Sequence, residues 1–341
     1  SMRDDFRSAA EWATAAPNRF HLNLTERCPL RCLHCITEAP RKTEQGVARS
    51  MMPEVLAALS GYLREARHIS LCHAGEPMLS PAFRPLMQLV ASAAQPPVVH
   101  LMSNGLALTE ERFLWAVERG LRSLVISVDG LSPETHDQMR VGSSIHELSE
   151  TLRKTGDLRR RLGLPVRLGI SWTVHKGNLN ELESLPEQAR QWGLDAIKVE
   201  ELVNTGPAAN ALGPLPDTLL MPALQHLRQQ CEAMGIMFVD HTRERRVLRC
   251  QDRAEEAVDR LFRGDDFINS DTINPCHAPY DTIYVEPDGT VKPVSFHHRG
   301  AGNLLQQPLE EIWNGEEFRA WRRLAAGRRL CGNGPDCGGR D

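Results

Sequence analysis

Short apolar runs alternate with amphipathic stretches between about residues 19 and 204. The runs are rich in β-branched and other apolar residues, which predicts strands. They cover residues 20–25, 68–72, 98–103, 123–128, 166–172 and 196–200. The segments between them show helical spacing with glycine or proline near their ends, most clearly at 52–67, 110–120, 145–162 and 179–193. Successive β-α units predict a parallel sheet with helices outside, either an open doubly wound sheet or a barrel-like one, with functional loops at the carboxyl ends of the strands.

The pattern changes after residue 204. Residues 204–217 are rich in glycine and proline and predict a linker, and residues 218–262 predict two helical stretches around a short apolar run at 236–239. Beyond residue 270, strands at 282–286 and 290–294 flank a Pro287-Asp288-Gly289 turn, and a helix at 308–324 precedes a glycine-rich tail. We therefore expect three parts, at 17–204, 205–265 and 266–341.

Composition narrows the class of protein. Hydrophobic residues make up 41% and charged residues 25% of the 341, as in ordinary globular proteins. No apolar run approaches the ~18 residues of a membrane span, and the N-terminus lacks the apolar core of a secretory signal. These features predict a cytoplasmic protein without a membrane partner. The net charge of −4 argues against nucleic acid as a partner.

The chain has nine cysteines, and disulfides are uncommon in the cytoplasm, so clustered cysteines point to metal or cluster ligation. Cys28, Cys32 and Cys35 form a CxxxCxxC set just after the first predicted strand. Thiolates suit an iron–sulfur cluster, and three of them leave one iron open for a small molecule. A structural zinc site needs a closed set of four ligands, and His34 is poorly placed as the fourth. A zinc knuckle or a group of buried cysteines is the alternative.

The stretch from Cys28 to Cys35 resembles the signature of the radical S-adenosylmethionine (SAM) superfamily. In that family the residue before the last cysteine is usually aromatic, whereas this chain has His34. The resemblance implies a partial (β/α)6 TIM-like barrel and a [4Fe-4S] cluster whose open iron binds the amino and carboxylate groups of SAM. It also implies one-electron cleavage of SAM to a 5′-deoxyadenosyl radical, with a flavodoxin- or ferredoxin-like reductase as the electron donor.

Further motifs follow in the order that the family shows. Gly75-Glu76-Pro77 resembles the end of its GGEP motif, with Ala74 in place of the first glycine, and implies that Glu76 holds the SAM amino group. The remaining SAM-site residues implied by the resemblance come after later strands. They are Ser103 and Asn104 in an "NG" turn, Ser127 and Asp129 near the ribose, Arg140 at the SAM carboxylate, and the loops at 174–178 and 201–203, including Leu202, beside adenine and ribose.

The C-terminal part resembles the SPASM or twitch extension, a small α+β domain with a β-hairpin and a helix that carries auxiliary iron–sulfur clusters. The candidate ligands are Cys276, Cys331 and Cys337. Relatives usually have a further cysteine after the strand that follows "DG", where this chain continues into Val294. The missing ligand could be a histidine, His297 or His298, an exogenous group, or Cys250. A module without a cluster is the alternative.

The resemblance implies an enzyme that oxidises or cross-links a substrate by hydrogen abstraction. The expected reactions are peptide maturation, which here would need a separate recognition protein, or dehydrogenation of a small molecule such as an aminocyclitol, in natural-product biosynthesis. No catalytic side chain is assigned; the candidates near the barrel mouth are His73, Glu200, Glu201, His297 and His298. A non-catalytic iron–sulfur or zinc-binding structural protein is the competing hypothesis.

Overall fold

The computed structural model describes residues 1–202, 211–242, 278–293, 296 and 298–326. Within them one sheet of ten strands runs in the order β12-β11-β10-β1-β3-β4-β5-β7-β8-β9. Its parallel strands are β1 (Arg19–Leu22), β3 (His68–Leu71), β4 (Val98–Ser103), β5 (Leu121–Ser127), β7 (Arg167–Val174), β8 (Ala196–Glu201), β9 (Met237–His241) and β10 (Thr282–Val285). The antiparallel strands β11 (Thr290–Lys292) and β12 (Gly302–Asn303) complete it, and β2 (Arg31–Cys32) pairs separately with β6 (Arg140–Val141).

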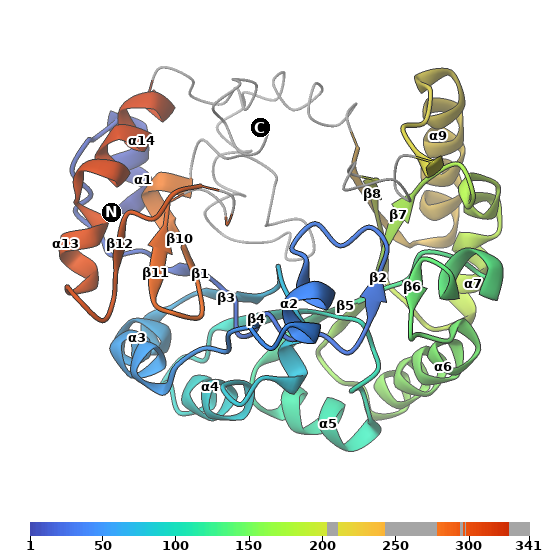
Figure 1. Ribbon diagram of the computed structural model, residues 1–341, viewed down its shortest axis with the longest axis horizontal. Helices are drawn as coiled ribbons and strands as arrows, with labels where there is room; N and C mark the ends of the chain where they lie inside the picture. The colour runs from blue at the N-terminus through green and yellow to red at the C-terminus, as the bar shows by residue number, and fades with distance from the viewer. Residues whose placement is uncertain (203–210, 243–277, 294–295, 297, 327–341) are drawn as a thin grey trace.

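The sheet curves into an open barrel with helices along its outer side (Figure 1). The outer helices are α3 (Pro53–Glu65), α4 (Phe83–Ala91), α5 (Glu110–Glu118), α6 (Ile145–Leu162), α7 (Leu185–Gln191) and α9 (Asp217–Met234). The other helices are α1 (Met2–Ser8), α2 (Ala39–Glu44), α12 (Ala278–Asp281), α13 (Leu309–Trp313) and α14 (Glu316–Ala326), with the short turns η1 (Pro77–Leu79), η2 (Pro133–Asp137) and η3 (Leu179–Glu183). No helix among the described residues is long and apolar enough to cross a membrane.

The main core lies between the sheet and the outer helices. Alternate residues of β7, among them Ile170 and Trp172, belong to this core, because successive side chains of a strand point to opposite faces. On the inner face His100 of β4 and Ser123 of β5 form a 2.9 Å hydrogen bond across neighbouring strands. The barrel therefore has an apolar outer face and a partly polar interior.

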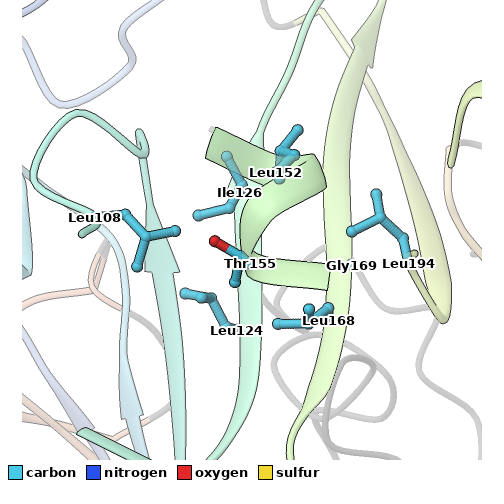
Figure 2. A pocket seen from close by; sticks show the side chains of 8 residues that line it. All are labelled: Leu108, Leu124, Ile126, Leu152, Thr155, Leu168, Gly169 and Leu194. Carbon is cyan, nitrogen blue, oxygen red and sulfur yellow. The ribbon is translucent and has the colours of Figure 1, made fainter. Parts of the chain in front are cut away.

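An apolar gap beneath α6 belongs to this core. It lies between α6 and the β5–β7 part of the sheet, and the gap leaves no room for a water molecule (Figure 2). Its lining is Leu108, Leu124, Ile126, Leu152, Thr155, Leu168, Gly169 and Leu194. It is a packing imperfection rather than a ligand site.

The predicted fold class is confirmed: a partial barrel of parallel β-α units carries a C-terminal hairpin and helices. Two details add to the prediction and one differs from it. Residues 237–239 of the predicted apolar run lie in β9, which pairs in parallel with β8, and the hairpin joins the same sheet because β10 pairs in parallel with β1. Beyond residue 242, the second helical stretch predicted within 218–262 lies outside the described residues. The helix predicted at 308–324 is two helices, α13 and α14, separated at Asn314-Gly315. The domain boundaries at 204 and 266 stay a prediction.

Candidate functional site

The three cysteines of the CxxxCxxC set lie on the segment after β1, at the carboxyl ends of the barrel strands. Cys32 is part of β2 and pairs with Arg140 of β6, and the Leu33 N–H donates to the Met139 carbonyl at 2.9 Å. All three thiols are free and half-buried. The small β2–β6 sheet thus ties the cysteine segment to the loop that follows β5.

Polar side chains approach all three sulfur atoms. The Asn104 amide nitrogen lies 3.7 Å from Cys28 Sγ, Arg140 Nη1 lies 3.8 Å from Cys32 Sγ, and Thr37 Oγ1 lies 3.4 Å from Cys35 Sγ. Burial raises the pKa of the Cys28 and Cys32 thiols, that of Cys32 to about 11, and for Cys32 the Arg140 charge opposes the rise. Charge on the neighbouring cysteines, Cys35 among them, adds to the rise of both pKa values. Such a group is stabilised by a cationic centre that binds all three.

The number and type of these donors fit a cubane cluster. Cys28, Cys32 and Cys35 are three half-buried thiols on one short segment. Thiolates are the ligands that iron–sulfur clusters take, one for each iron that the protein binds. Three thiols therefore fit a [4Fe-4S] cluster with one iron not bound by this segment.

The loop after β3 packs directly on the backbone that leads into the cysteines. Gly75 has φ +64°, and a Cβ there would lie 2.3 Å from the Thr25 carbonyl oxygen and 2.6 Å from that of Arg27. The Glu76 N–H donates to the same Arg27 oxygen at 2.8 Å. Only glycine combines this backbone conformation with so close an approach.

Three donors hold the Glu76 carboxylate in a fully buried position. The Met78 N–H and the Ser103 hydroxyl donate to Oε1 at 3.2 and 2.9 Å, and the Asn104 N–H donates to Oε2 at 2.8 Å. Burial raises the pKa of Glu76, and these hydrogen bonds oppose the rise. Pro77 starts the η1 turn just after it. Glu76 therefore links the ends of β3 and β4 beside Cys28.

A second buried carboxylate, Asp129, lies at the end of β5. Its Oδ2 is 2.6 Å from Arg140 Nε and 3.2 Å from His34 Nε2, and its Oδ1 accepts the Thr173 N–H at 2.8 Å. Burial alone would raise the pKa of Asp129, but the charges of Arg140 and His34 hold it below its usual value. The carboxylate is therefore ionised and joins β5, β6, β7 and the cysteine segment.

The structure thus brings together most of the predicted site residues that it describes. The Asn104 side chain contacts a cysteine sulfur, Glu76 contacts both Ser103 and Asn104, and Arg140 contacts Asp129 and Cys32. Ser127 ends β5 and Leu202 follows β8, both half-buried, with no hydrogen bond to this group among the described residues. The predicted ligands Cys276, Cys331 and Cys337, together with Cys250, Val294 and His297, lie outside the described residues.

Sequence reasoning missed the role of His34 as a partner of Asp129. The signal was present, because His34 stands where an aromatic residue is usual, but its partner is 95 positions away in the chain. Thr173 was also missed, because its backbone N–H, not its side chain, makes the contact.

The candidate bases take several positions. His73 stacks on Phe296 with ring centroids 4.1 Å apart, and His298 lies 4.7 Å from the Trp321 ring. Glu200 contacts Lys198 at 2.5 Å and His241 at 3.6 Å on the inner face of the sheet. Glu201 is the last residue of β8. None of these contacts assigns a proton transfer.

Comparison with known proteins agrees with this geometry. Residues 22–186 match the family model of the radical SAM superfamily, and residues 276–338 match that of the SPASM iron–sulfur cluster-binding domain. An AdoMet-dependent heme synthase of Methanosarcina barkeri is 25% identical, over 94% of this chain and 88% of the relative. A PqqA peptide cyclase of Xanthomonas axonopodis pv. citri is 29% identical, over 91% of this chain and 78% of the relative.

Solved structures share the fold. SuiB of Streptococcus suis bound to S-adenosylmethionine aligns with a TM-score of 0.65 at 12% identity, over 90% of this chain and 68% of that one. Native anSMEcpe with bound AdoMet and Cp18Cys peptide aligns with a TM-score of 0.62 at 17% identity, over 93% of this chain and 88% of that one. The two matched domains imply a [4Fe-4S] cluster, SAM and auxiliary iron–sulfur binding as the cofactors. The chain belongs to the radical SAM superfamily, in the branch that carries a SPASM domain.

Proposed function

We propose that this protein cleaves SAM reductively and uses the resulting radical to abstract hydrogen from a substrate, as the first step of an oxidation or a cross-link. When bound, a [4Fe-4S] cluster together with SAM supplies a 5′-deoxyadenosyl radical after one-electron reduction. The observation that carries the proposal is the meeting of Cys28, Cys32 and Cys35 with the Gly75-Glu76 loop at one edge of the barrel.

The three cysteines would bind the cluster, and neighbouring side chains would stabilise their thiolates. Asn104 and Arg140 place N–H donors toward the sulfur atoms of Cys28 and Cys32. Such donors stabilise thiolates and tune an iron–sulfur centre. With three protein ligands, one iron is left for the amino and carboxylate groups of SAM.

Glu76 would orient the amino group of SAM. A carboxylate has about four acceptor positions, and donors among the described residues fill three of them. The remaining position suits an N–H of the SAM amino group, which is uncharged when its lone pair binds iron, and burial strengthens that hydrogen bond because water does not compete.

Arg140 would meet the SAM carboxylate with donors that the protein leaves available. A guanidinium has five N–H groups. Arg140 directs Nε toward Asp129 and one Nη1 hydrogen toward Cys32. The others can form the parallel pair of hydrogen bonds that a carboxylate accepts. Ser127 and Leu202, at the ends of neighbouring strands, would border the ribose and adenine.

The C-terminal module would carry an auxiliary cluster. The SPASM match at 276–338 contains Cys276, Cys331 and Cys337, which we propose as its ligands. Such a cluster could bind the substrate or accept the electron that remains on a substrate radical. A flavodoxin- or ferredoxin-like reductase in the cytoplasm would reduce the first cluster.

The substrate class is a peptide or a small molecule. Support for a peptide comes from relatives named PqqA peptide cyclase and from the structure of SuiB bound to precursor peptide SuiA. Support for a small molecule comes from relatives named AdoMet-dependent heme synthase.

Anaerobic reconstitution followed by SAM and dithionite tests the proposal. We expect the wild type to release 5′-deoxyadenosine, measured by liquid chromatography and mass spectrometry, and Cys32→Ala to lose at least 99% of that yield. Cys231→Ala is the matched control, because Cys231 is a fully buried cysteine on α9, away from the site. A wild type that binds iron and sulfide but releases no 5′-deoxyadenosine would favour the non-catalytic alternative.

A further inference from the structure

Two buried charged side chains, Arg140 and Asp129, connect Cys32 with His34 on the same cysteine segment. Cys32 Sγ lies 3.8 Å from Arg140 Nη1, and Arg140 Nε lies 2.6 Å from Asp129 Oδ2. The same Oδ2 lies 3.2 Å from Nε2 of His34, two residues after Cys32. The cysteine segment is therefore held at two points by one carboxylate, directly and through a guanidinium.

The side chains in this chain of contacts are buried, which restricts their movement. The Asp129 side chain has no exposed surface, and those of Arg140 and His34 are only 12% exposed. Oδ1 of Asp129 accepts the Thr173 N–H of β7, which restrains the carboxylate against turning away from Arg140 and His34. Breaking a buried contact to an ionised carboxylate leaves charge without compensation, which proteins rarely tolerate.

Among these residues, His34 is the one that departs from the family pattern. The resemblance places an aromatic ring before the last cysteine, and a hydrocarbon ring has no nitrogen to reach Asp129. The nitrogen of His34 that approaches Asp129 is Nε2, 3.2 Å from Oδ2. Among the described residues neither Oδ2 of Asp129 nor Nδ1 of His34 has a partner in hydrogen-bond geometry, so this approach is a close polar contact. It is made through one nitrogen of the ring.

The effect of this contact falls on backbone hydrogen bonds of the cysteine segment. The Leu33 N–H donates to the Met139 carbonyl at 2.9 Å, and the Cys35 N–H donates to the Cys32 carbonyl at 3.4 Å. The first bond joins the residue after β2 to the residue before Arg140, and the second closes the turn from Cys32 to Cys35. Leu33 lies between the two points at which Asp129 holds the segment, and Cys35 directly follows the second of them.

We propose that His34 is a positioning residue that, through Asp129 and Arg140, fixes the cysteine segment in its ligating arrangement before any cluster is assembled. The inference rests on the proposed function only in taking Cys28, Cys32 and Cys35 as the cluster ligands. The segment is then preorganised in the apo protein by a polar contact that a hydrocarbon ring could not make.

Hydrogen exchange of the apo protein, measured by mass spectrometry over the peptide that contains residues 32–36, tests this directly. His34→Phe should raise exchange at the Leu33 and Cys35 amides at least tenfold, and His34→Gln, which keeps a donor, should restore rates to within threefold of wild type. If the phenyl ring prevents folding, His34→Ala serves in its place. Rates within twofold of wild type in the folded variant would overturn the proposal.

A matched control separates this local role from general destabilisation. Asp281→Asn removes another fully buried aspartate that pairs with an arginine, Arg19, at 3.0 Å, at the opposite end of the strands. We expect Asp281→Asn to leave the Leu33 and Cys35 amides within twofold of wild type. An equal rise in this control would overturn the proposal.

Electron paramagnetic resonance of the reconstituted, reduced protein gives the second readout. The g values of the cluster should shift in His34→Phe and return in His34→Gln, and a spectrum that is unchanged in His34→Phe would overturn the proposal. The apo measurement also keeps two failures apart. If the wild type never cleaves SAM but the exchange rates change as expected, the proposed function fails and the positioning role stands.

Discussion

Replacement of Gly75 by alanine gives a sharp test of how the loop after β3 meets the cysteine segment. The added Cβ would lie 2.3 and 2.6 Å from the carbonyl oxygens of Thr25 and Arg27. Both are backbone atoms, and Arg27 directly precedes Cys28, so neither can move without disturbing the cysteines.

The magnitude has two parts. Alanine at a positive φ costs about 1 kcal/mol relative to glycine. Overpacking against atoms that cannot rotate away adds about 1–3 kcal/mol. Gly163→Ala isolates the first part, because Gly163 has φ +59° at the end of α6 and a Cβ there would meet nothing within 4 Å. We expect losses in the free energy of unfolding of about 1 kcal/mol for Gly163→Ala and about 3 kcal/mol for Gly75→Ala.

Urea unfolding of the apo proteins, followed by circular dichroism, measures both variants. Gly75→Ala should also bind less iron on reconstitution, whereas Gly163→Ala should bind as much as wild type. Equal unfolding free energies for the two variants would refute the close backbone approach at Gly75.

Two further predictions concern the stability contributed by Glu26, just before the cysteine segment, and by Gly156 on α6. Burial would raise the pKa of Glu26, but hydrogen bonds from Arg49 and Lys42 hold it at about 2. The ionised carboxylate therefore stabilises the fold fully above pH 4.5, and this stabilisation is lost as the pH falls toward 2. Glu26→Gln should therefore lower the free energy of unfolding by about 2 kcal/mol at pH 7, a value discounted for the exposure of Arg49. The loss of stability between pH 5 and 2 should be smaller in the variant than in the wild type. An equal loss in both proteins would contradict the ion pairing of Glu26. Gly156→Ala should destabilise the protein by about 2 kcal/mol in thermal unfolding, because the added Cβ would lie 2.0 Å from the Trp192 carbonyl oxygen. This loss should exceed the gain from the higher helix propensity of alanine. A stabilised variant would show that α6 can shift outward.

The sequence predicts the repeated units of this fold well, because each strand and helix carries its own periodicity. Edge pairing is different, since it joins segments far apart in the chain. The strand β9 is only five residues long, its apolar run looks isolated between helical patterns in the sequence, and it is a strand because it pairs with β8. The pairing of β10 with β1, 263 positions apart at Arg19 and Thr282, likewise leaves no local signal.

The same distinction applies to the site. The spacing of Cys28, Cys32 and Cys35 indicates its chemistry locally, and the Gly75-Glu76 loop is recognisable by its sequence. The pairing of Asp129 with both Arg140 and His34 cannot be recognised in the sequence, because three segments must fold before these side chains come into contact. The resemblance suggests SAM as the partner of Arg140, whereas the fold first gives this arginine a carboxylate and a thiol.

The proposed function requires that three cysteines hold a cluster with one iron open to SAM. Electron-nuclear double resonance on the reduced, reconstituted wild type, with SAM labelled by 15N at the amino group, detects whether SAM binds that iron. We predict a 15N coupling that appears with labelled SAM, is absent with unlabelled SAM, and is lost in Cys32→Ala. A fully assembled cluster whose spectrum does not change on addition of SAM, with no 15N coupling, would show that no iron is open to SAM.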